Sequence, residues 1–505
     1  MESLLIDNNG VEVTSDESLG RIVVANTEFS TSFGVIVRER PALVWDAVPS
    51  QFLMGYQNFL QAYNQQTREI KEQIQELFHP PLDGDSSMVQ TLRPVAQQLA
   101  LSYREYDVCF IHKLLTILAS NAHQYYGHKV ESRDDLRQHE SNVSPSGCGT
   151  LALYLFGSKV QHSCNPNATY TSKTSDGALE YKAVRVIKTG EQVSFSYIGD
   201  LFHTPTFMRR EKLHCEKDFL CMCERCTGLD YCRVAKCPEC GELSPSQTTP
   251  FSSMWKCMNG CTPSLVNETL ERNYNDHLTK IKSMMRAETP DHLIYDFIRG
   301  ATMDLSPTHF VCVGGWLELA TLYASKAAEK EQAAQLSMFA TTSLLERTDG
   351  VSELSIRELR RKAALSGLRA ISLIECVAEN CKGCKPGCYN HAPVYESSAR
   401  MFHVCIDLID LDPSEYPSGA KNMMRRYVPL MKAAFGNDDR DVLRIQTEML
   451  SQDSNPETLR RCEYCKASKE NLLVCSRCYL VHYCSKECQV KHWKSGHKAQ
   501  CIPCP

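Results

Sequence analysis

Three features that would suggest a membrane, secreted or nucleic-acid-binding protein are missing from this sequence. The formal net charge is only −5 and the pI is near 6.4, so overall charge gives no reason to bind nucleic acid or an anionic membrane. The longest apolar stretch, from Phe310 to Ala328, contains Glu318 and Lys326, which predicts a buried or amphipathic helix rather than a membrane span. The opening residues, MESLLIDNNGVEVTSDES, lack the basic start and apolar run of a secretory leader. We therefore expect a soluble intracellular protein without direct nucleic-acid binding, and no compact basic run decides between nucleus and cytoplasm.

Cysteine, in contrast, is plentiful. The 505 residues include 26 cysteines, and most of them fall in CxxC or CxxxC pairs. In a reducing compartment such pairs are typical of zinc sites rather than of disulfides. The length exceeds what one hydrophobic core supports, and an apolar content of 43% is enough to fill several cores.

The sequence QHSCNPN, residues 161–167, is the most informative stretch. Further along come Tyr197, in VSFSYIG, and the cluster FLCMCERC. Cys164 and the three cysteines of that cluster provide the four thiolates that a tetrahedral structural zinc requires. These ligands are Cys164, Cys221, Cys223 and Cys226. A metal bound there would join two segments that are distant in the sequence.

These residues resemble the SET-domain lysine methyltransferases and, within them, the SET and MYND group. QHSCNPN is similar to that family's NHSCxPN, GEQVSFSYIG to its GEExxxSY, and FLCMCERC to its post-SET zinc segment. The resemblance implies an α+β multidomain protein whose β-rich SET domain is split by a helical insertion and followed by a post-SET zinc site. It also implies methyl transfer from S-adenosylmethionine to a lysine amine of a protein substrate.

The same resemblance assigns candidate site residues. Tyr197 is the preferred catalytic residue and Tyr154 the second choice, although a lone tyrosine at a strand end is more often a core residue. The residues implied to bind the methyl donor are Gly20, Arg21, Asn121, Gln161, His162, Tyr197 and Phe219. For Asn121 the alternative is a simple helix cap.

Two residues depart from the family pattern. Ile22 stands where the GxG loop has its second glycine, and Gln161 stands where the family has asparagine. These departures support an alternative hypothesis, in which the chain is a binding adaptor whose SET core has lost efficient turnover. If the chain is catalytic, we expect a Gln161→Asn substitution to keep or raise activity.

Two further groups of cysteines follow the post-SET segment. A CxxC pair and a CxxxC pair predict a zinc ribbon, with surface thiols as the alternative. The candidate ligands are Cys237, Cys240, Cys257 and Cys261. A later cluster leaves metal binding and an irregular loop both open, and it contains Cys381, Cys384, Cys388 and His391.

Helical periodicity extends from the ribbon to the last cysteine-rich segment. The expected helices are 268–286, 290–299, 310–329, 331–346, 354–379, 394–410, 419–434 and 438–451. The family resemblance implies that they form an all-α, tetratricopeptide-like lobe, but no 34-residue signature repeats cleanly.

The last segment, 462–501, has seven cysteines and one histidine at the spacing of two zinc sites and resembles a MYND finger. The resemblance implies a small cross-brace fold with two interleaved ligand sets. One set is Cys462, Cys465, Cys484 and Cys488, and the other is Cys475, Cys478, His497 and Cys501. MYND fingers bind proteins, often proline-rich peptides, so the resemblance also implies a peptide partner. Metal must supply the folding free energy because so short a segment has little core.

The predicted domain boundaries follow from these segments. We expect a flexible segment 1–18, a first SET half 19–47, a helical insertion 48–140, a second SET half 141–200, a post-SET zinc segment 201–230, a ribbon 231–265, a helical lobe 266–455 and a MYND finger 462–501.

Overall fold

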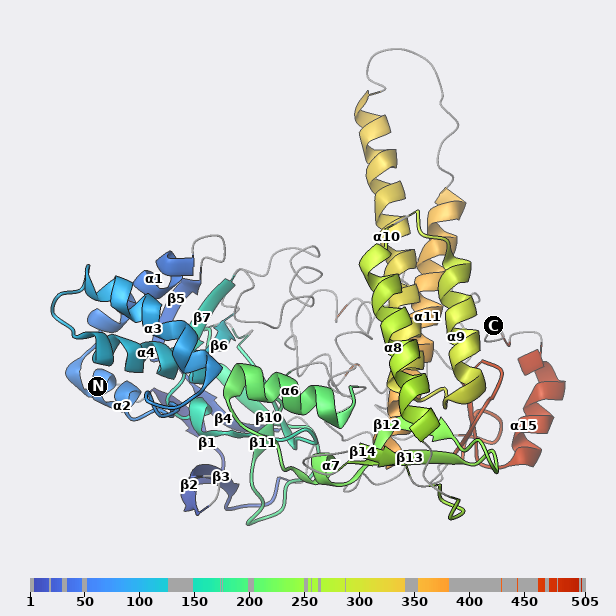
Figure 1. Ribbon diagram of the computed structural model, residues 1–505, viewed down its shortest axis with the longest axis horizontal. Coiled ribbons are helices and arrows are strands. Elements are labelled where there is room, and N and C mark those ends of the chain that lie inside the picture. Colours follow the sequence, from blue (N-terminus) through green and yellow to red (C-terminus); the bar gives the residue numbers. More distant parts are fainter. Residues whose placement is uncertain are drawn as a thin grey trace. The chain divides into compact units, whose positions relative to one another are not determined.

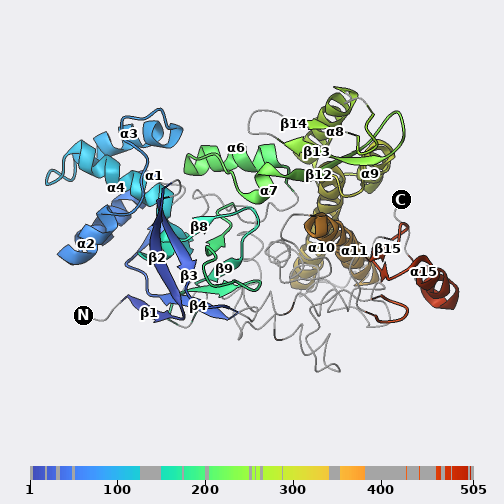
Figure 2. The same ribbon diagram turned by 90° about the horizontal axis from the view of Figure 1, so that it is seen from below.

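The computed structural model describes residues 4–125, 149–198, 204–340, 353–380 and 462–501, together with 428 and 443 (Figures 1 and 2). Short stretches inside these ranges are excepted, namely 18–19, 30–33, 48–51, 173, 175, 249–252, 256, 262–264, 287, 468–471, 479 and 499–500. The chain divides into two compact units. The first contains Met1–Leu201 and Phe207–Cys223, and the second contains Phe202–Thr206, Glu224–Lys432 and Asn437–Pro505, with Ala433–Gly436 grouped with the first. In the described part of the chain, no helix is both long enough and apolar enough to cross a membrane.

The first unit contains several small sheets. Its strands are β1 (Leu5–Asn8), β2 (Val11–Asp16), β3 (Gly20–Ala25), β4 (Val35–Glu39), β5 (Leu43–Ala47), β6 (His123–Tyr125), β7 (Gly149–Leu153), β8 (Gln161–His162), β9 (Ala168–Thr171), β10 (Leu179–Ala183) and β11 (Ser194–Phe195). They pair in the orders β1-β4-β10-β9, β5-β7-β6, β2-β3 and β8-β11. Alternate residues of these strands, among them Val37, Tyr181 and Phe195, face a shared apolar core.

Strands from before and after the helical segment pair with each other. β4 is antiparallel to β10, with Val37 opposite Tyr181. β5 is antiparallel to β7, with Trp45 opposite Leu151. The two parts of the sheet region, which lie far apart in the sequence, therefore fold as one body.

Four helices form the segment between these strands, and Figure 1 shows them gathered beside β5 and β7. They are α1 (Phe52–Asn64), α2 (Arg68–Gln75), α3 (Ser87–Ala100) and α4 (Val108–Asn121). Phe59 and Tyr63, four residues apart on one face of α1, are buried in the core of this segment. α3 begins at Ser87 because Ser86 caps it by accepting the Val89 N–H.

The segment expected to be flexible, 1–18, instead contributes two strands. β1 pairs with β4, and β2 pairs along its whole length with β3. Val11 is buried in the sheet core, which gives the segment an apolar anchor. The expectation of flexibility was wrong because two short runs of this segment pair with β4 and β3, and Val11 anchors the second run although Glu12 and Val13 are exposed.

The expected post-SET segment contains the helix α6 (Thr206–Lys217) and, after it, the short helix α7 (Glu224–Thr227). The ribbon segment forms a three-stranded antiparallel sheet. Its strands are β12 (Leu229–Lys236), β13 (Leu243–Thr248) and β14 (Ser253–Trp255).

Long helices complete the described part of the second unit before its finger. They are α8 (Leu265–Met284), α9 (Asp291–Asp304), α10 (Phe310–Ala340) and α11 (Glu353–Asn380). α10 is one helix, whereas the periodicity predicted a break at residue 330; Lys330 is a good helix former, and the surrounding sequence has no glycine or proline to end the helix. The helices expected at 394–410, 419–434 and 438–451 lie outside the described residues, apart from 428 and 443.

The last segment is compact and small. It contains β15 (Leu473–Val474), β16 (His482–Tyr483), α15 (Lys486–His492) and the π-helical turn η5 (Trp493–His497). Ser485 caps α15 by accepting the Cys488 N–H, which places two cysteines of this segment at one helix start.

Candidate active site and zinc centres

Tyr197 is held in place by hydrogen bonds at its backbone N–H and at its side-chain hydroxyl. It follows β11, which pairs in parallel with β8, so that Phe195 lies beside His162. The Tyr197 backbone N–H donates to Nδ1 of His162 at 3.0 Å, and the Tyr197 hydroxyl donates to the Val160 carbonyl at 2.8 Å. The direction of the phenol is therefore fixed before any ligand arrives.

Three rings meet at this place. The centroids of His162 and Tyr197 are 5.3 Å apart, those of His162 and Phe219 are 5.9 Å apart, and those of Tyr197 and Phe219 are 6.3 Å apart. Burial raises the pKa of Tyr197 above its usual range, so the phenol keeps its proton at neutral pH. Sequence analysis placed all three in one site, and the structure brings them together.

His162 also reaches the first cysteine cluster. Because Nδ1 accepts the Tyr197 N–H, the proton of the neutral ring must lie on Nε2. Nε2 lies 3.2 Å from Sγ of Cys164 and can donate to it. A sulfur that accepts an N–H in this way is the usual environment of a zinc-bound thiolate, so one imidazole connects the candidate metal centre to Tyr197.

The four sulfurs of that cluster fit a zinc ion. Those of Cys164, Cys221, Cys223 and Cys226 all lie within 4.8 Å of one another, and Cys164 and Cys221 are 3.9 Å apart. Tetrahedral zinc with bonds of about 2.3 Å requires sulfurs about 3.8 Å apart. An all-thiolate set without an open position suits a structural zinc rather than a catalytic one.

Gln161 and Arg21 contact each other directly. The side-chain Nε2 of Gln161 donates to the Arg21 carbonyl at 2.8 Å, and this bond joins β8 to the start of β3. The Arg21 guanidinium donates to the Glu76 carbonyl. Gly20 has a φ of +73°, and a Cβ built on it would meet nothing within 4 Å, so the chain leaves open space at this bend. Ile22 lies in β3 opposite Thr14.

Asn121 is engaged inside the helical segment. It is buried, and its Nδ2 donates to the carbonyls of Phe78 and Ile117, both at 2.7 Å. These contacts match the alternative interpretation of Asn121 as a residue that ends a helix. The structure does not show it in contact with Tyr197 or His162.

Tyr154 contacts other residues than Tyr197 does. It is fully buried, its hydroxyl donates to the Gly177 carbonyl at 3.1 Å, and its ring meets His123 edge-on. Burial raises the pKa of its phenol. These contacts are those of a core tyrosine with a satisfied hydroxyl, and they involve neither His162 nor Phe219.

Lys217 is a residue of this site that sequence analysis missed. Its Nζ lies 5.9 Å from the centre of the Tyr197 ring and donates to the carbonyls of Ala119 and Ser120, each at 3.2 Å. Burial lowers the pKa of its ammonium. Within the part of the chain that the structure describes, no carboxylate is paired with this amine. The sequence around Lys217, at the end of α6, does not indicate this role, because the two carbonyls that it contacts lie 98 and 97 residues earlier in the chain.

The last segment contains two further metal-ligand groups, each within 4.8 Å. They are Cys462, Cys465, Cys484 and Cys488, and Cys475, Cys478, His497 and Cys501, the same two sets that the resemblance implies. Sγ of Cys465 is 3.5 Å from that of Cys484, and Nε2 of His497 is 3.4 Å from Sγ of Cys475. These separations again fit the edges of a zinc tetrahedron.

The ribbon cysteines also come together. Cys237, Cys240, Cys257 and Cys261 lie within 4.8 Å of one another. The cluster of Cys381, Cys384, Cys388 and His391 lies outside the described residues.

Comparison with known proteins adds two domain matches. Residues 46–198 match the model of the SET domain, and residues 462–501 match that of the MYND finger. The chain is 27% identical over 170 residues to a putative SET domain-containing protein of Acanthamoeba polyphaga mimivirus, which covers 33% of this chain and 64% of that protein.

Two further relatives match over shorter stretches. A SET and MYND domain-containing protein of Dictyostelium discoideum is 31% identical over 115 residues, which are 23% of this chain and 20% of the relative. The N-lysine methyltransferase SMYD2 of Homo sapiens is 48% identical over 72 residues, which are 14% of this chain and 16% of the relative. The chain thus matches less than two thirds of the length of each of these relatives.

Proposed function

Since this chain is a SET and MYND domain-containing protein, we propose that it is a protein-lysine N-methyltransferase that uses S-adenosylmethionine. The observation that supports this most directly is His162, which connects the Tyr197 backbone to the thiolate of Cys164. A rigid connection of this kind fixes the phenol relative to Phe219 and keeps the three rings in place.

The residues around Tyr197 fit the methyl donor. The rings of His162 and Phe219 offer faces to a purine, and the open space at Gly20 lets backbone approach a ligand. The ammonium of Lys217 donates to the Ala119 and Ser120 carbonyls and has a third N–H, which would suit the carboxylate of the donor's amino-acid end. Bound there, S-adenosylmethionine would supply a methyl group activated by its sulfonium.

Tyr197 would orient the lysine amine of the substrate. Because its proton is committed to the Val160 carbonyl, the phenol oxygen can still accept an N–H from the amine. Accepting that N–H would turn the amine lone pair toward the methyl group. The raised pKa of Tyr197 keeps it protonated, so it acts by orientation and not as a general base.

The amine must lose its proton before it can react. The positive charge of Lys217, close to the Tyr197 ring, disfavours a second cation and would lower the pKa of the incoming amine. The neutral amine is therefore more populated at a given pH. We propose this as the electrostatic contribution of Lys217 to the reaction.

The metal centres have a structural role in this proposal. Cys164 and its partners would hold one zinc, and the MYND finger would hold two. None of these donor sets leaves a position for a substrate. The finger would bind a partner protein, and its exposed Tyr464 and Val490 offer apolar surface to a peptide, for which a proline-rich sequence is the first candidate.

The experiment measures donor binding by calorimetry on the purified full chain, and then methyl incorporation into histones and a cell lysate. We expect micromolar or tighter binding, and incorporation that falls by about 10- to 100-fold in Tyr197→Phe. Lys212→Met, on the α6 surface, is the control and should retain both. A zinc-loaded, folded protein that binds no donor would contradict the proposal and favour the adaptor hypothesis.

A further inference from the structure

The cysteines of the sheet β12-β13-β14 lie outside both matched domains. Cys237 is at the end of β12 and Cys240 is in the turn before β13. Cys257 and Cys261 follow β14. The sulfurs of Cys240 and Cys257 are 3.4 Å apart, and the Asn259 amide lies 3.6 Å from Sγ of Cys240. The strands thus bring two cysteine turns face to face.

The first of these turns repeats a turn of the MYND finger. In the finger, the Lys466 N–H donates to the Cys462 carbonyl at 2.8 Å, the Cys462 N–H donates to the Ala467 carbonyl at 3.0 Å, and Lys466 has a φ of +61°. The ribbon has the same three features at the same spacing.

In the ribbon, the Gly241 N–H donates to the Cys237 carbonyl at 2.8 Å, the Cys237 N–H donates to the Glu242 carbonyl at 2.8 Å, and Gly241 has a φ of +76°. This turn aims two sulfurs of a CxxC pair at one point, and in the finger they belong to a four-cysteine group. The second ribbon turn also has a left-handed glycine, Gly260, with a φ of +81°.

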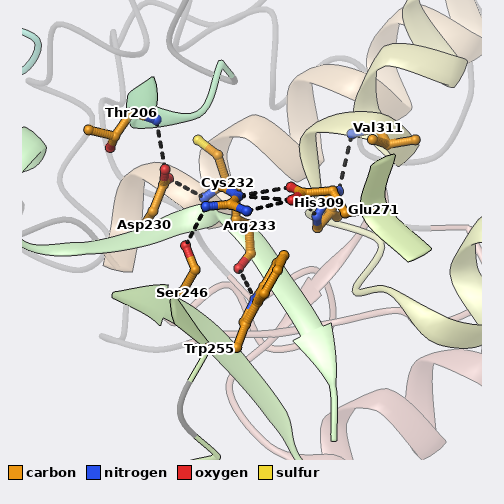
Figure 3. Close-up of polar contacts among 9 residues, drawn as sticks. All are labelled: Thr206, Asp230, Cys232, Arg233, Ser246, Trp255, Glu271, His309 and Val311. Carbon is orange, nitrogen blue, oxygen red and sulfur yellow. Dashed lines mark hydrogen bonds and ion pairs between the residues drawn. The ribbon is translucent and has the colours of Figure 1, made fainter. Parts of the chain in front are cut away.

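The sheet that carries these turns also holds a buried ion pair (Figure 3). Arg233, on β12, donates from Nε to Glu271 of α8 at 2.8 Å, and both side chains are almost fully buried. The Arg233 guanidinium lies 4.4 Å from the centre of the Trp255 ring, and the indole N–H donates to the Arg233 carbonyl at 2.9 Å. His309 approaches the same carboxylate at 3.3 Å.

The cysteine turns and the buried ion pair lie close together in the sequence, both at β12 and at β14. Arg233 precedes Cys237 on β12, and Trp255 precedes Cys257 after β14. A strand as short as β14, with three residues, has few ladder bonds to hold its register. A metal that joins the two turns would fix that register and, through it, the position of Trp255 against Arg233.

We propose that Cys237, Cys240, Cys257 and Cys261 bind a further structural zinc ion, and that this ion keeps the ribbon sheet in the register that pairs Arg233 with Glu271. The donor set is four thiolates, which favours zinc over harder cations. A buried ion pair tolerates little displacement, so the metal stabilises the contact between the sheet and α8. This inference does not depend on methyltransferase activity.

The first test uses the unaltered full chain under reducing conditions. Iodoacetamide is added before and after EDTA, and each cysteine peptide is followed by mass spectrometry. Cys215 is the internal comparison, because it is exposed and belongs to none of the four cysteine groups of the described residues. We expect Cys215 to react at once and the exposed Cys240 to react only after chelation. Equal rates for the two before chelation would overturn the proposed site.

The second test compares a Cys240→Ser and Cys261→Ser double variant with Cys215→Ser. We expect the double variant to lose one zinc per chain relative to the unaltered protein, and Cys215→Ser to lose none. Hydrogen exchange of β12 and of the α8 turn around Glu271 should become at least tenfold faster in the double variant only. An unchanged zinc content would refute the site, and a lost zinc with unchanged exchange at α8 would refute the coupling. If the double variant does not fold, the alkylation result decides.

Discussion

Replacing Gln161 by asparagine tests the structural account of the donor pocket most sharply. From the family pattern alone, Gln161→Asn should keep or raise activity. The structure predicts the opposite, because the Gln161 amide holds the Arg21 carbonyl at 2.8 Å and thereby ties the bend at Gly20 to β8. Asparagine is one methylene shorter, so its amide would fall more than an ångström short and the bond would be lost.

The size of the effect follows from that one bond. A hydrogen bond between neutral groups contributes about 0.5–1.5 kcal/mol net, which corresponds to roughly 2- to 12-fold in an equilibrium constant. The bend at Gly20 would then be ordered only when the donor binds, and the cost would appear in donor affinity. We expect S-adenosylmethionine to bind Gln161→Asn about 2- to 12-fold more weakly.

Calorimetry with the purified variant measures this directly, and circular dichroism checks that the fold is retained. Gln61→Asn is the matched control, because the same substitution on the exposed face of α1 should leave donor affinity unchanged. Equal or tighter donor binding by Gln161→Asn would refute the structural reasoning and restore the expectation from the family pattern.

The remaining predictions concern four neighbouring side chains. Cys164→Ser should remove one zinc and weaken donor binding by about tenfold or more, since His162 loses its sulfur partner; metal analysis with calorimetry would detect both, and normal affinity after zinc loss would count against the link. Tyr197→Phe should lower kcat by about 10- to 100-fold with little change in donor affinity, and a reduced affinity with intact kcat would argue against an orienting role. Lys217→Met should move the pH dependence of kcat/KM to higher pH, and an unmoved profile would exclude the electrostatic contribution. Burial, with Lys217 nearby, lowers the pKa of His123 to about 4, below its unfolded value of about 6.5, so the unfolded state binds more protons between these values and stability should fall as pH drops through that window. When the pH falls from 7 to 5, the free energy of unfolding should therefore decrease by about 2 kcal/mol less in His123→Phe than in the unaltered chain. Urea titrations at both pH values would measure this difference, and equal decreases in the two proteins would contradict the prediction.

The metal-binding parts of the site could be predicted well from the sequence. Zinc requires a fixed number of thiolates at short spacing, so the pairs that begin at Cys462 and Cys475 can be recognised as zinc ligands without knowledge of the fold. The close packing of the Tyr197, His162 and Phe219 rings was also predictable, but only through the family resemblance. Hydrophobic periodicity predicted the helices that the structure describes between Leu265 and Asn380, although it introduced a false break in α10.

Contacts between distant segments could not be predicted in this way. Lys217 acts through carbonyls of α4, and any residue type supplies a carbonyl, so no letter of the sequence marks the partner. The same holds for Gln161 and the Arg21 carbonyl. For Asn121, the match to a family position suggested a ligand contact, and nothing in the sequence indicates that its amide donates to the Phe78 and Ile117 carbonyls.

The strand β7 has a consequence for how this fold can vary. Ala47, the last residue of β5, lies opposite Gly149, and His123, the first residue of β6 after the helices, lies opposite Ala152. The chain therefore leaves the sheet on one side of β7 and returns on its other side, so both ends of the helical segment are held by the same strand. Closing a flexible loop between fixed ends costs only about 0.6 kcal/mol more for each doubling of the loop length. Insertions in the loops that connect these helices should therefore leave the pairing of β5, β6 and β7 unchanged.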